Sequence, residues 1–365
     1  MERRRLVVRA AVPLTRSRRS EDDTLSTLES ICRRPPYVGR WRRALSPFLR
    51  GGARGVLLQV AVFAVVVLFV AVIGRNVAGN LERLGVHTGF AFLRRTAGFD
   101  LSQTLIPYSD SATYLRVFFV ALLNTLLVTA LCIVLSTLLG FFVALARRSS
   151  NGLVAAAGTL YVETFRNVPL LIQLLFWYFA VMQTLPAPRQ SLRIADIVFL
   201  NNRGLFIPWI DATGSLSIPR LEGFNFHGGL TILPELLALT VGLTIYSASF
   251  IAEIIRAGIQ ATSRGQIDAA YSLGLTHWQT TRLIVIPLAL RVIVPPLGAY
   301  YGVLLKNTSL GSAIAYPELI LVFAGTVLNQ TAQPIEVMTM TLATYLALGV
   351  ALSFATSALN RRLQR

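Results

Sequence analysis

The sequence predicts an all-α integral membrane protein with six membrane-spanning helices. Of its 365 residues, 54% are hydrophobic and 14% are charged, and the mean hydropathy is +0.61. Several stretches of 17 to 30 residues carry no charge at all, and uncharged apolar runs of that length span a bilayer. The net charge of +17 would indicate nucleic-acid binding in a soluble protein. Here the hydropathy excludes that class, together with soluble enzymes and disulfide scaffolds.

Residues 1–55 predict a basic cytoplasmic tail, since fourteen arginines and five acids occur there without an apolar period. Residues 56–73 follow as an apolar run whose only strongly polar member is Gln59. Such a run extends about 27 Å as a helix, which is enough to cross a bilayer. We therefore predict an extra N-terminal transmembrane helix at 56–78. A cleaved signal peptide is the alternative, but the preceding basic region is too long for one.

Five further spans are predicted from the apolar runs that follow, and two long loops separate some of them. The loop at 79–114 is mixed in composition and is expected to hold short helices, whereas 187–229 is a polar insertion punctuated by prolines and glycines. The five spans cover 117–146, a segment centred on 168–185, 231–255, 286 to about 315, and 336–359.

Arginines orient these spans. Arginine-rich segments occur at 1–55, 147–152, 256–291 and 361–365, and basic residues flanking membrane helices mark the cytoplasmic side. Six spans with both termini in the cytoplasm satisfy this assignment. The loops at 79–114 and 187–229 are then periplasmic.

The cytoplasmic segment 262–287 contains a predicted short helix that carries small residues. Asp268-Ala269-Ala270 lies on it, and Gly274 is placed to end it. A short helix held outside the membrane suits insertion into a groove on another protein. The alternative is an amphipathic connection lying on the lipid surface, for which Trp278 and Arg282 would serve.

The spacing in this segment resembles the EAA signature of ABC-importer permeases. Asp268-Ala269-Ala270 is followed by three residues, Gly274, nine residues, Ile284, one residue and Ile286-Pro287. The sequence departs from the signature at two positions, where Asp268 replaces Glu and Ile286 replaces Leu. The resemblance implies a type I (MetI-like) permease core of five transmembrane helices at 115–360, and a coupling helix that seats in a separate ATPase. It assigns ATPase coupling to Gln266, Asp268, Ala269, Ala270, Gly274, Leu275, Ile284 and Pro287.

Four other segments resemble the polar amino acid permeases, of the histidine and glutamine permease type. They are Asn124-Thr125-Leu126, the stretch from Glu163 to Gln173, the stretch from Ala252 to Ile259, and Lys306-Asn307-Thr308-Ser309-Leu310. The extra first span and the insertion resemble the larger permease of general L-amino acid transporters. The resemblance implies a bacterial inner-membrane location. Its partners would be two ATPase copies, a second permease of similar fold and a periplasmic amino-acid-binding protein.

Two charged residues near the start of the third span are candidates for the substrate path. Glu163 and Arg166 are three residues apart and so share a helix face. Charge inside a membrane segment is costly and usually is paired or faces a cavity, so an ion pair that only neutralises both is the equal alternative. Pro169 breaks the helix beside them, as happens at transport sites.

A polar cluster interrupts the fifth span and is a second candidate. Lys306 is the only lysine of the chain, and Asn307, Thr308 and Ser309 follow it. These groups, with Ser247 on the fourth span, offer the donors and acceptors that an amino acid needs. Hydroxyls in membrane helices more often bridge neighbouring helices. For Glu253 and Arg256, a structural ion pair is the favoured interpretation.

The chain itself is not expected to be an enzyme or to hold a cofactor or metal. A phosphate-binding loop needs Gly-Lys-Ser/Thr, and the only lysine lies between Leu305 and Asn307. Cys32 and Cys132 are expected at different depths, so no disulfide is predicted. The alternative function is a stand-alone secondary transporter or channel for small polar solutes. Whether the pore is a homodimer or a heterodimer stays open.

Overall fold

The computed structural model describes residues 53–83, 89–210 and 214–364. Nearly all of the predicted tail at 1–55 lies outside these residues. The chain divides into two compact units, residues 1–85 and residues 86–365. In the first unit, α3 (Ala53–Arg83) covers the predicted extra span and continues beyond it. Its window Gln59–Asn76 is apolar enough to cross a membrane.

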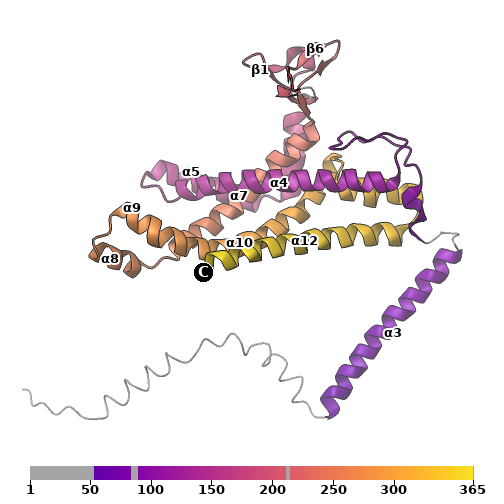
Figure 1. Ribbon diagram of the computed structural model, residues 1–365, viewed down its shortest axis with the longest axis horizontal. Coiled ribbons are helices and arrows are strands. Elements are labelled where there is room, and N and C mark those ends of the chain that lie inside the picture. The colour runs from indigo at the N-terminus through magenta and orange to yellow at the C-terminus, as the bar shows by residue number, and fades with distance from the viewer. Residues whose placement is uncertain (1–52, 84–88, 211–213, 365) are drawn as a thin grey trace, which may run out of the picture. The chain divides into compact units, whose positions relative to one another are not determined.

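The second unit is built mainly from helices (Figure 1). A short helix, η1 (Phe90–Arg94), lies in the loop where short helices were predicted. The others are α4 (Tyr114–Ala146), α5 (Gly152–Asn167), α6 (Leu170–Leu175), η2 (Phe176–Met182), η3 (Pro188–Gln190), α7 (Pro234–Gln260), α8 (Arg264–Ser272), α9 (His277–Thr280), η4 (Thr281–Val285), α10 (Ile286–Asn307), η5 (Thr308–Ile314), η6 (Ile320–Val327), α11 (Leu328–Thr331) and α12 (Pro334–Gln364).

The described residues contain five helical stretches long and apolar enough to cross a membrane, and a bent pair that can count as a sixth. This agrees with the six predicted spans and confirms a mostly helical membrane protein. The stretch His277–Ile314 passes through α9, η4, α10 and η5 as one candidate span of 38 residues. The fifth span therefore starts earlier than residue 286, where it was predicted to begin.

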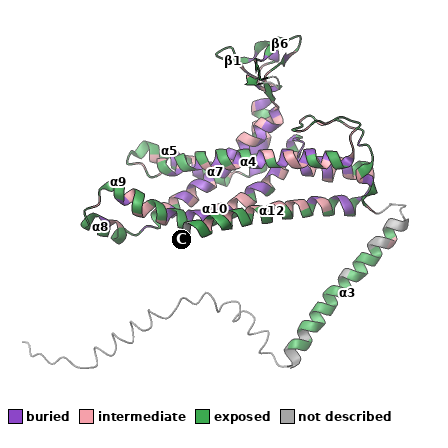
Figure 2. Ribbon diagram, in the orientation of Figure 1, coloured by how far each residue is buried: buried purple, intermediate pink, exposed green. Residues whose placement is uncertain are grey.

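Helix α7 is the centre of the second unit. Of its apolar window, 61% is buried inside the protein, against 11% for α12, whose outer side is exposed (Figure 2). Helix α7 packs against α4, α5 and α10. Gly258 lets α7 approach α10, because a Cβ built there would stand 2.2 Å from the side chain of Ile293. Small residues at such crossings are typical of membrane helices.

The third span is broken at the proline, as predicted, and its second part, Leu170–Met182, lies within the predicted segment 168–185, while α5 extends the span toward the N-terminus. Helices α5 and α6 meet at a bend of 103°. At the break, Val168 is extended and Pro169 supplies no backbone donor. Gln173 donates its side-chain amide to the carbonyls of Phe165 and Val168, each at 2.9 Å. The amide thus partners two carbonyls that the break leaves without a helical donor.

The insertion at 187–229 is not a simple polar loop, because it folds into short strands. Strands β1 (Leu192–Ile194), β2 (Val198–Asn201), β3 (Gly204–Ile207) and β8 (Leu230–Ile232) form one antiparallel sheet in that order. Two further pairs are β4 (Trp209–Ile210) with β5 (Leu216–Ser217), and β6 (Arg220–Glu222) with β7 (Asn225–His227). The rings of Phe199, Phe206 and Phe226 form its core. Strand β8 also displaces the predicted start of the fourth span to Pro234.

An apolar segment after the fifth span was not assigned to any helix. Residues Ile320–Thr331 form a helix too short to cross a bilayer, and its first part, η6, packs against α4 and α12. Phe323 and Val327 there are fully buried. This segment fills the space between two spans rather than adding another one.

Replacing Gln173 tests the role of its amide at the break. Gln173→Leu removes both bonds and leaves two carbonyls unsatisfied, so unfolding should become easier by about 1–3 kcal/mol. Thermal unfolding of the purified chain, followed by tryptophan fluorescence, measures the loss. Gln190→Leu, at an exposed position on η3, is the matched control and should change little. Equal melting temperatures for the two variants would contradict this role.

Candidate functional site

The loop between α7 and α10 is held by three local motifs. Ser263 begins α8, its hydroxyl accepting from the Gln266 backbone while the Gln266 side chain accepts from the Ser263 backbone. Thr276 and Gln279 repeat this capping box at α9. Gly274 ends α8 with φ +80°, and the amides of Gly274 and Leu275 bond back to Tyr271 and Ala270. Helix α8 is therefore fixed at both ends.

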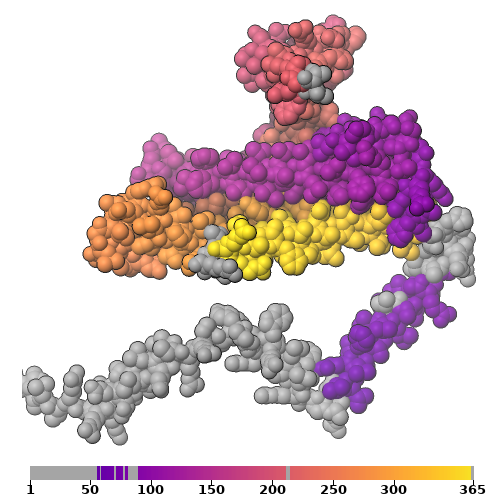
Figure 3. Space-filling view, viewed as in Figure 1, coloured from indigo at the N-terminus to yellow at the C-terminus, as the bar shows by residue number. Residues whose placement is uncertain are grey.

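The same loop exposes large apolar side chains. Leu273 is 82% exposed, Trp278 66% and Leu283 61%. The loop forms one end of the second unit, beyond the ends of α7 and α10 (Figures 1 and 3). Several exposed apolar side chains of this size on one short segment are typical of a surface that binds a partner or a membrane.

The predicted coupling residues do not all lie at this surface. Asp268, Ala269 and Gly274 are exposed, and Ala270 is buried. Ile284 lies on η4 and Pro287 in the first turn of α10. These last two residues are thus at the far end of the segment 262–287, where the helix that leaves the loop begins.

An ion-pair cluster joins two helices, α4 and α7, next to this loop. Nε of Arg256 donates to Glu253 at 2.9 Å, and Arg147, at the end of α4, donates to Glu253 at 2.6 Å. The predicted Glu253–Arg256 pair is therefore confirmed. Arg147 extends it and ties the end of α4 to α7.

Glu163 and Arg166 do not form the ion pair that was the structural alternative for them. Among the described residues the ion pairs are Arg147–Glu253, Arg256–Glu253 and Arg193–Asp196. Both Glu163 and Arg166 are exposed on α5. The guanidinium carbon of Arg166 lies 4.9 Å from the centroid of the Phe250 ring on α7. Sequence reasoning did not single out Phe250.

The polar cluster at the end of α10 bonds largely to its own helix. The hydroxyl of Thr308 donates to the carbonyl of Leu305, and that of Ser309 to the carbonyl of Lys306, each at 2.7 Å. Lys306 is exposed and Asn307 is half-buried. No hydrogen bond or ion pair in the described chain joins this cluster to Glu163 or Arg166. Ser247 is fully buried, and its hydroxyl has no hydrogen-bond partner.

A buried polar network around Glu318 was missed. Glu318 is 0% exposed and accepts bonds from the amides of Ile320 and Leu321, each at 2.7 Å, and from the hydroxyl of Tyr345 at 3.0 Å. Asn124 on α4 donates to the carbonyl of Pro317 at 2.9 Å. The available signal was Pro-Glu at the start of an apolar segment, where an acid stabilises the first helical amides.

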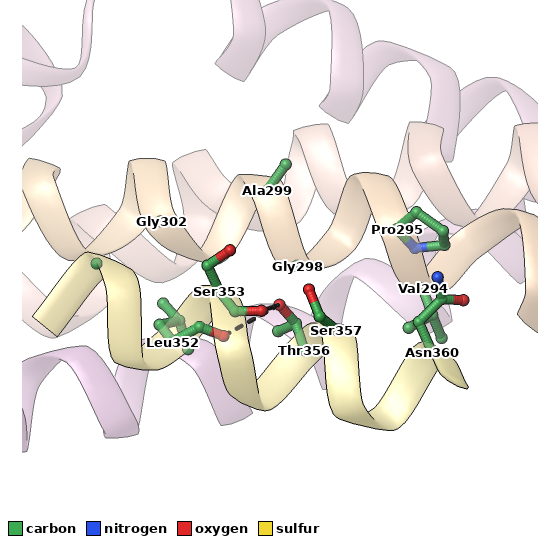
Figure 4. A pocket seen from close by; sticks show the side chains of 11 residues that line it. Val294, Pro295, Gly298, Ala299, Gly302, Leu352, Ser353, Thr356, Ser357 and Asn360 are labelled. Atoms are coloured by element: carbon green, nitrogen blue, oxygen red, sulfur yellow. Dashed lines mark hydrogen bonds between the residues drawn. The ribbon is translucent and has the colours of Figure 1, made fainter. Parts of the chain in front are cut away.

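A groove of about 280 Å³ runs between α10 and α12, and Figure 4 shows its small side chains. The hydroxyl of Thr356 bonds back to the carbonyls of its own helix. Surfaces of this kind suit close packing of helices more than binding of a charged solute. Its lining consists of Val294, Pro295, Gly298, Ala299, Gly302, Gly349, Leu352, Ser353, Thr356, Ser357 and Asn360.

The described residues also bear on metal and disulfide chemistry. In 53–83, 89–210 and 214–364, no three His, Cys, Asp or Glu side chains gather closely enough to hold a metal ion. Cys132 is a buried free thiol, and Cys32 lies outside the described residues.

The second unit is a bundle of membrane helices with a capped, exposed loop, and its broken helix carries charges that form no ion pair. This organisation is that of a transport subunit. The family model of binding-protein-dependent transport system inner membrane components matches residues 136–365. The chain belongs to this family, which comprises the permeases of ABC importers. It is a multi-pass membrane transport subunit and not an enzyme.

Relatives narrow this assignment to amino-acid permeases. The chain is 43% identical to the putative amino-acid ABC transporter permease protein YhdX of Escherichia coli (strain K12), covering 87% of this chain and 95% of that one. It is 36% identical to the general L-amino acid transport system permease protein AapQ of Rhizobium johnstonii, covering 85% and 92%. The crystal structure of an amino acid ABC transporter with histidines matches with a TM-score of 0.51 and 30% identity, covering 68% of this chain and 95% of that one.

Removing the shared acid tests the ion-pair cluster. Glu253→Gln leaves the guanidiniums of Arg147 and Arg256 without a charged partner, so the chain should lose about 1–3 kcal/mol of stability. Thermal unfolding of the purified chain measures this. The exposed pair Arg193–Asp196 provides the control, since Asp196→Asn should cost well under about 1 kcal/mol. A control loss as large as that of Glu253→Gln would contradict the assignment.

Proposed function

We propose that this chain is the transmembrane subunit of an ATP-driven amino acid importer, forming the translocation path and coupling to separate ATPase subunits. The observation that carries the proposal is the capped, exposed loop at 262–287, in a chain that resembles amino-acid ABC permeases over most of its length. Its other partners are a periplasmic amino-acid-binding protein and a second permease of similar fold. Two ATPase copies bind the pair. Both termini are cytoplasmic, and the β-strand insertion is periplasmic.

The loop is proposed to seat in a cleft of the ATPase. Asp268, Ala269 and Gly274 would face the ATPase, while Gln266 and Leu275 belong to the two turns that close α8. Ala270 is buried within this protein. Ile284 and Pro287 would stabilise the start of α10, the helix through which a displacement of the loop would reach the membrane. The two caps support this role, because a helix fixed at both ends transmits a push without first unwinding.

Close packing of α7 on α10 supports transmission into the membrane. These helices flank the loop, and Gly258 and Ile293 are in tight contact where they cross. A rigid, tightly packed pair moves as one body, since packed interfaces do not deform continuously. A displacement of α8 would then reach the translocation path through both helices together.

The substrate path is proposed to include Glu163 and Arg166 on α5. They carry opposite charges one helical turn apart, and neither makes an ion pair or side-chain hydrogen bond within the described residues. An amino acid brings an ammonium and a carboxylate, which match this pair. Ser247 and the cluster Lys306, Asn307, Thr308 and Ser309 are proposed to complete the path.

Transport by the assembled importer should depend on the ATPase. Reconstitution of this chain with its second permease and ATPase into liposomes, with the binding protein supplied outside, allows uptake of a radiolabelled amino acid to be followed. Uptake is expected to fall to background when ATP or the ATPase is omitted. Uptake that is unaffected by the omission would favour the stand-alone transporter or channel.

Gly274→Arg tests the coupling loop. The φ of +80° disfavours any residue with a Cβ, and a Cβ there meets no other atom within 4 Å, so the effect is confined to the loop. We expect normal membrane levels with loss of ATPase co-purification or of ATP-driven uptake. Gly274→Asn is the matched control, because Asn tolerates this conformation better, and it should retain most activity. Normal transport by the arginine variant would contradict a docked coupling helix.

A further inference from the structure

Three unpaired hydrogen-bond donors gather where α5, α7 and α10 meet. Arg166 comes from α5, Ser247 from α7 and Tyr300 from α10. Ser247 is fully buried, and the buried hydroxyls of both Ser247 and Tyr300 lack a hydrogen-bond partner. Buried polar groups in native proteins are nearly always bonded, so two adjacent exceptions call for an explanation.

Aromatic stacking holds the guanidinium of Arg166 near this point. Its carbon lies 4.9 Å from the Phe250 ring centroid. Phe250 also stacks on Tyr300, whose ring is nearly parallel to it, with an interplanar angle of 18° and a centroid distance of 5.5 Å. A guanidinium stacked by its face keeps its N–H edges free to donate. Arg166 makes no hydrogen bond or ion pair among the described residues.

The two hydroxyls and this charge surround one turn of α7. Ser247 lies three residues before Phe250 on α7, and Phe250 contacts both Arg166 and Tyr300. The hydroxyls of Ser247 and Tyr300 have no hydrogen-bond partner. A bond between them would use one O–H and leave the other free to donate. In either case, the three side chains have hydrogen-bond donors for which the described residues supply no acceptor.

We propose that Arg166, Ser247 and Tyr300 form a carboxylate-binding site that takes the α-carboxylate of the transported amino acid. This inference rests on the proposed function and adds Tyr300 and Phe250 to the path. A guanidinium edge and two hydroxyls are all donors, and a carboxylate is an acceptor with two oxygens that a guanidinium binds in a bidentate manner. Phe250 positions the guanidinium and does not itself touch the ligand.

Single-atom changes test the site without disturbing the stack. Tyr300→Phe and Ser247→Ala each remove one hydroxyl and leave the rings and Arg166 in place. In the reconstituted importer, each should lower the number of amino acids imported per ATP hydrolysed by about ten-fold, as expected for loss of a hydrogen bond to a charged group. Tyr301→Phe is the matched control, because the Tyr301 hydroxyl is bonded to Thr137 at 2.8 Å, and its ratio should equal that of the wild type.

The outcomes separate this inference from the proposed function. Wild-type uptake without ATP would refute the proposed function before any variant is compared. ATP-driven wild-type uptake with a normal ratio in Tyr300→Phe and Ser247→Ala would refute the carboxylate site alone. A parallel fall of ATP hydrolysis and uptake, with the ratio unchanged, would assign the hydroxyls to folding and also refute the site.

A binding measurement tests the chemistry of the ligand directly. The importer is placed in nanodiscs without the binding protein and mixed with the radiolabelled amino acid that the wild type takes up fastest from the common twenty. The same unlabelled amino acid should displace it, whereas its α-carboxamide should do so about ten-fold less well. Equal displacement by both, or no saturable binding to the wild type, would overturn the proposal.

Discussion

A broken membrane helix must find partners for its free amides and carbonyls inside the protein, and this requirement organises the second unit. At the first break, Gln173 provides donors for the carbonyls of Phe165 and Val168. At the second, Glu318 accepts from the amides of Ile320 and Leu321. Asn124 binds the carbonyl of Pro317. Unsatisfied backbone groups in hydrocarbon are so costly that these side chains make the irregular segments possible at all.

Because the backbone groups at these helix breaks are bonded, the bundle can combine rigid, closely packed helices with polar segments. The helices α7 and α10, which flank the capped loop, are held together by close contact at Gly258, and the cluster at Glu253 ties α4 to the same end. Beside these packed helices, α5 ends at its bend with α6, and Arg166 near that end lies against Phe250 of α7. The capped loop and the proposed carboxylate site are thus joined through the same packed helices.

The spans and the loop could be predicted from sequence because each is marked by residues that are close together in the chain. Uncharged runs predict spans, and the spacing from Asp268 to Pro287 predicts the loop. The strands of the insertion were missed because each is two to four residues long, and short strands among glycines and prolines resemble a loop. Tyr300 and Phe250 were missed because aromatic residues in an apolar helix give no signal until three helices bring them to Arg166. Glu318 shows the same limit, since only its burial reveals its role.

The helical stretch from His277 to Ile314 has a consequence for the membrane around it. Thirty-eight residues of helix extend about 57 Å, whereas a bilayer with its headgroups measures about 40–45 Å. The excess is accommodated by tilt of the helix or by ends that extend beyond the bilayer. Where the end at His277 extends beyond the bilayer, it also places the preceding α8 away from the lipid surface.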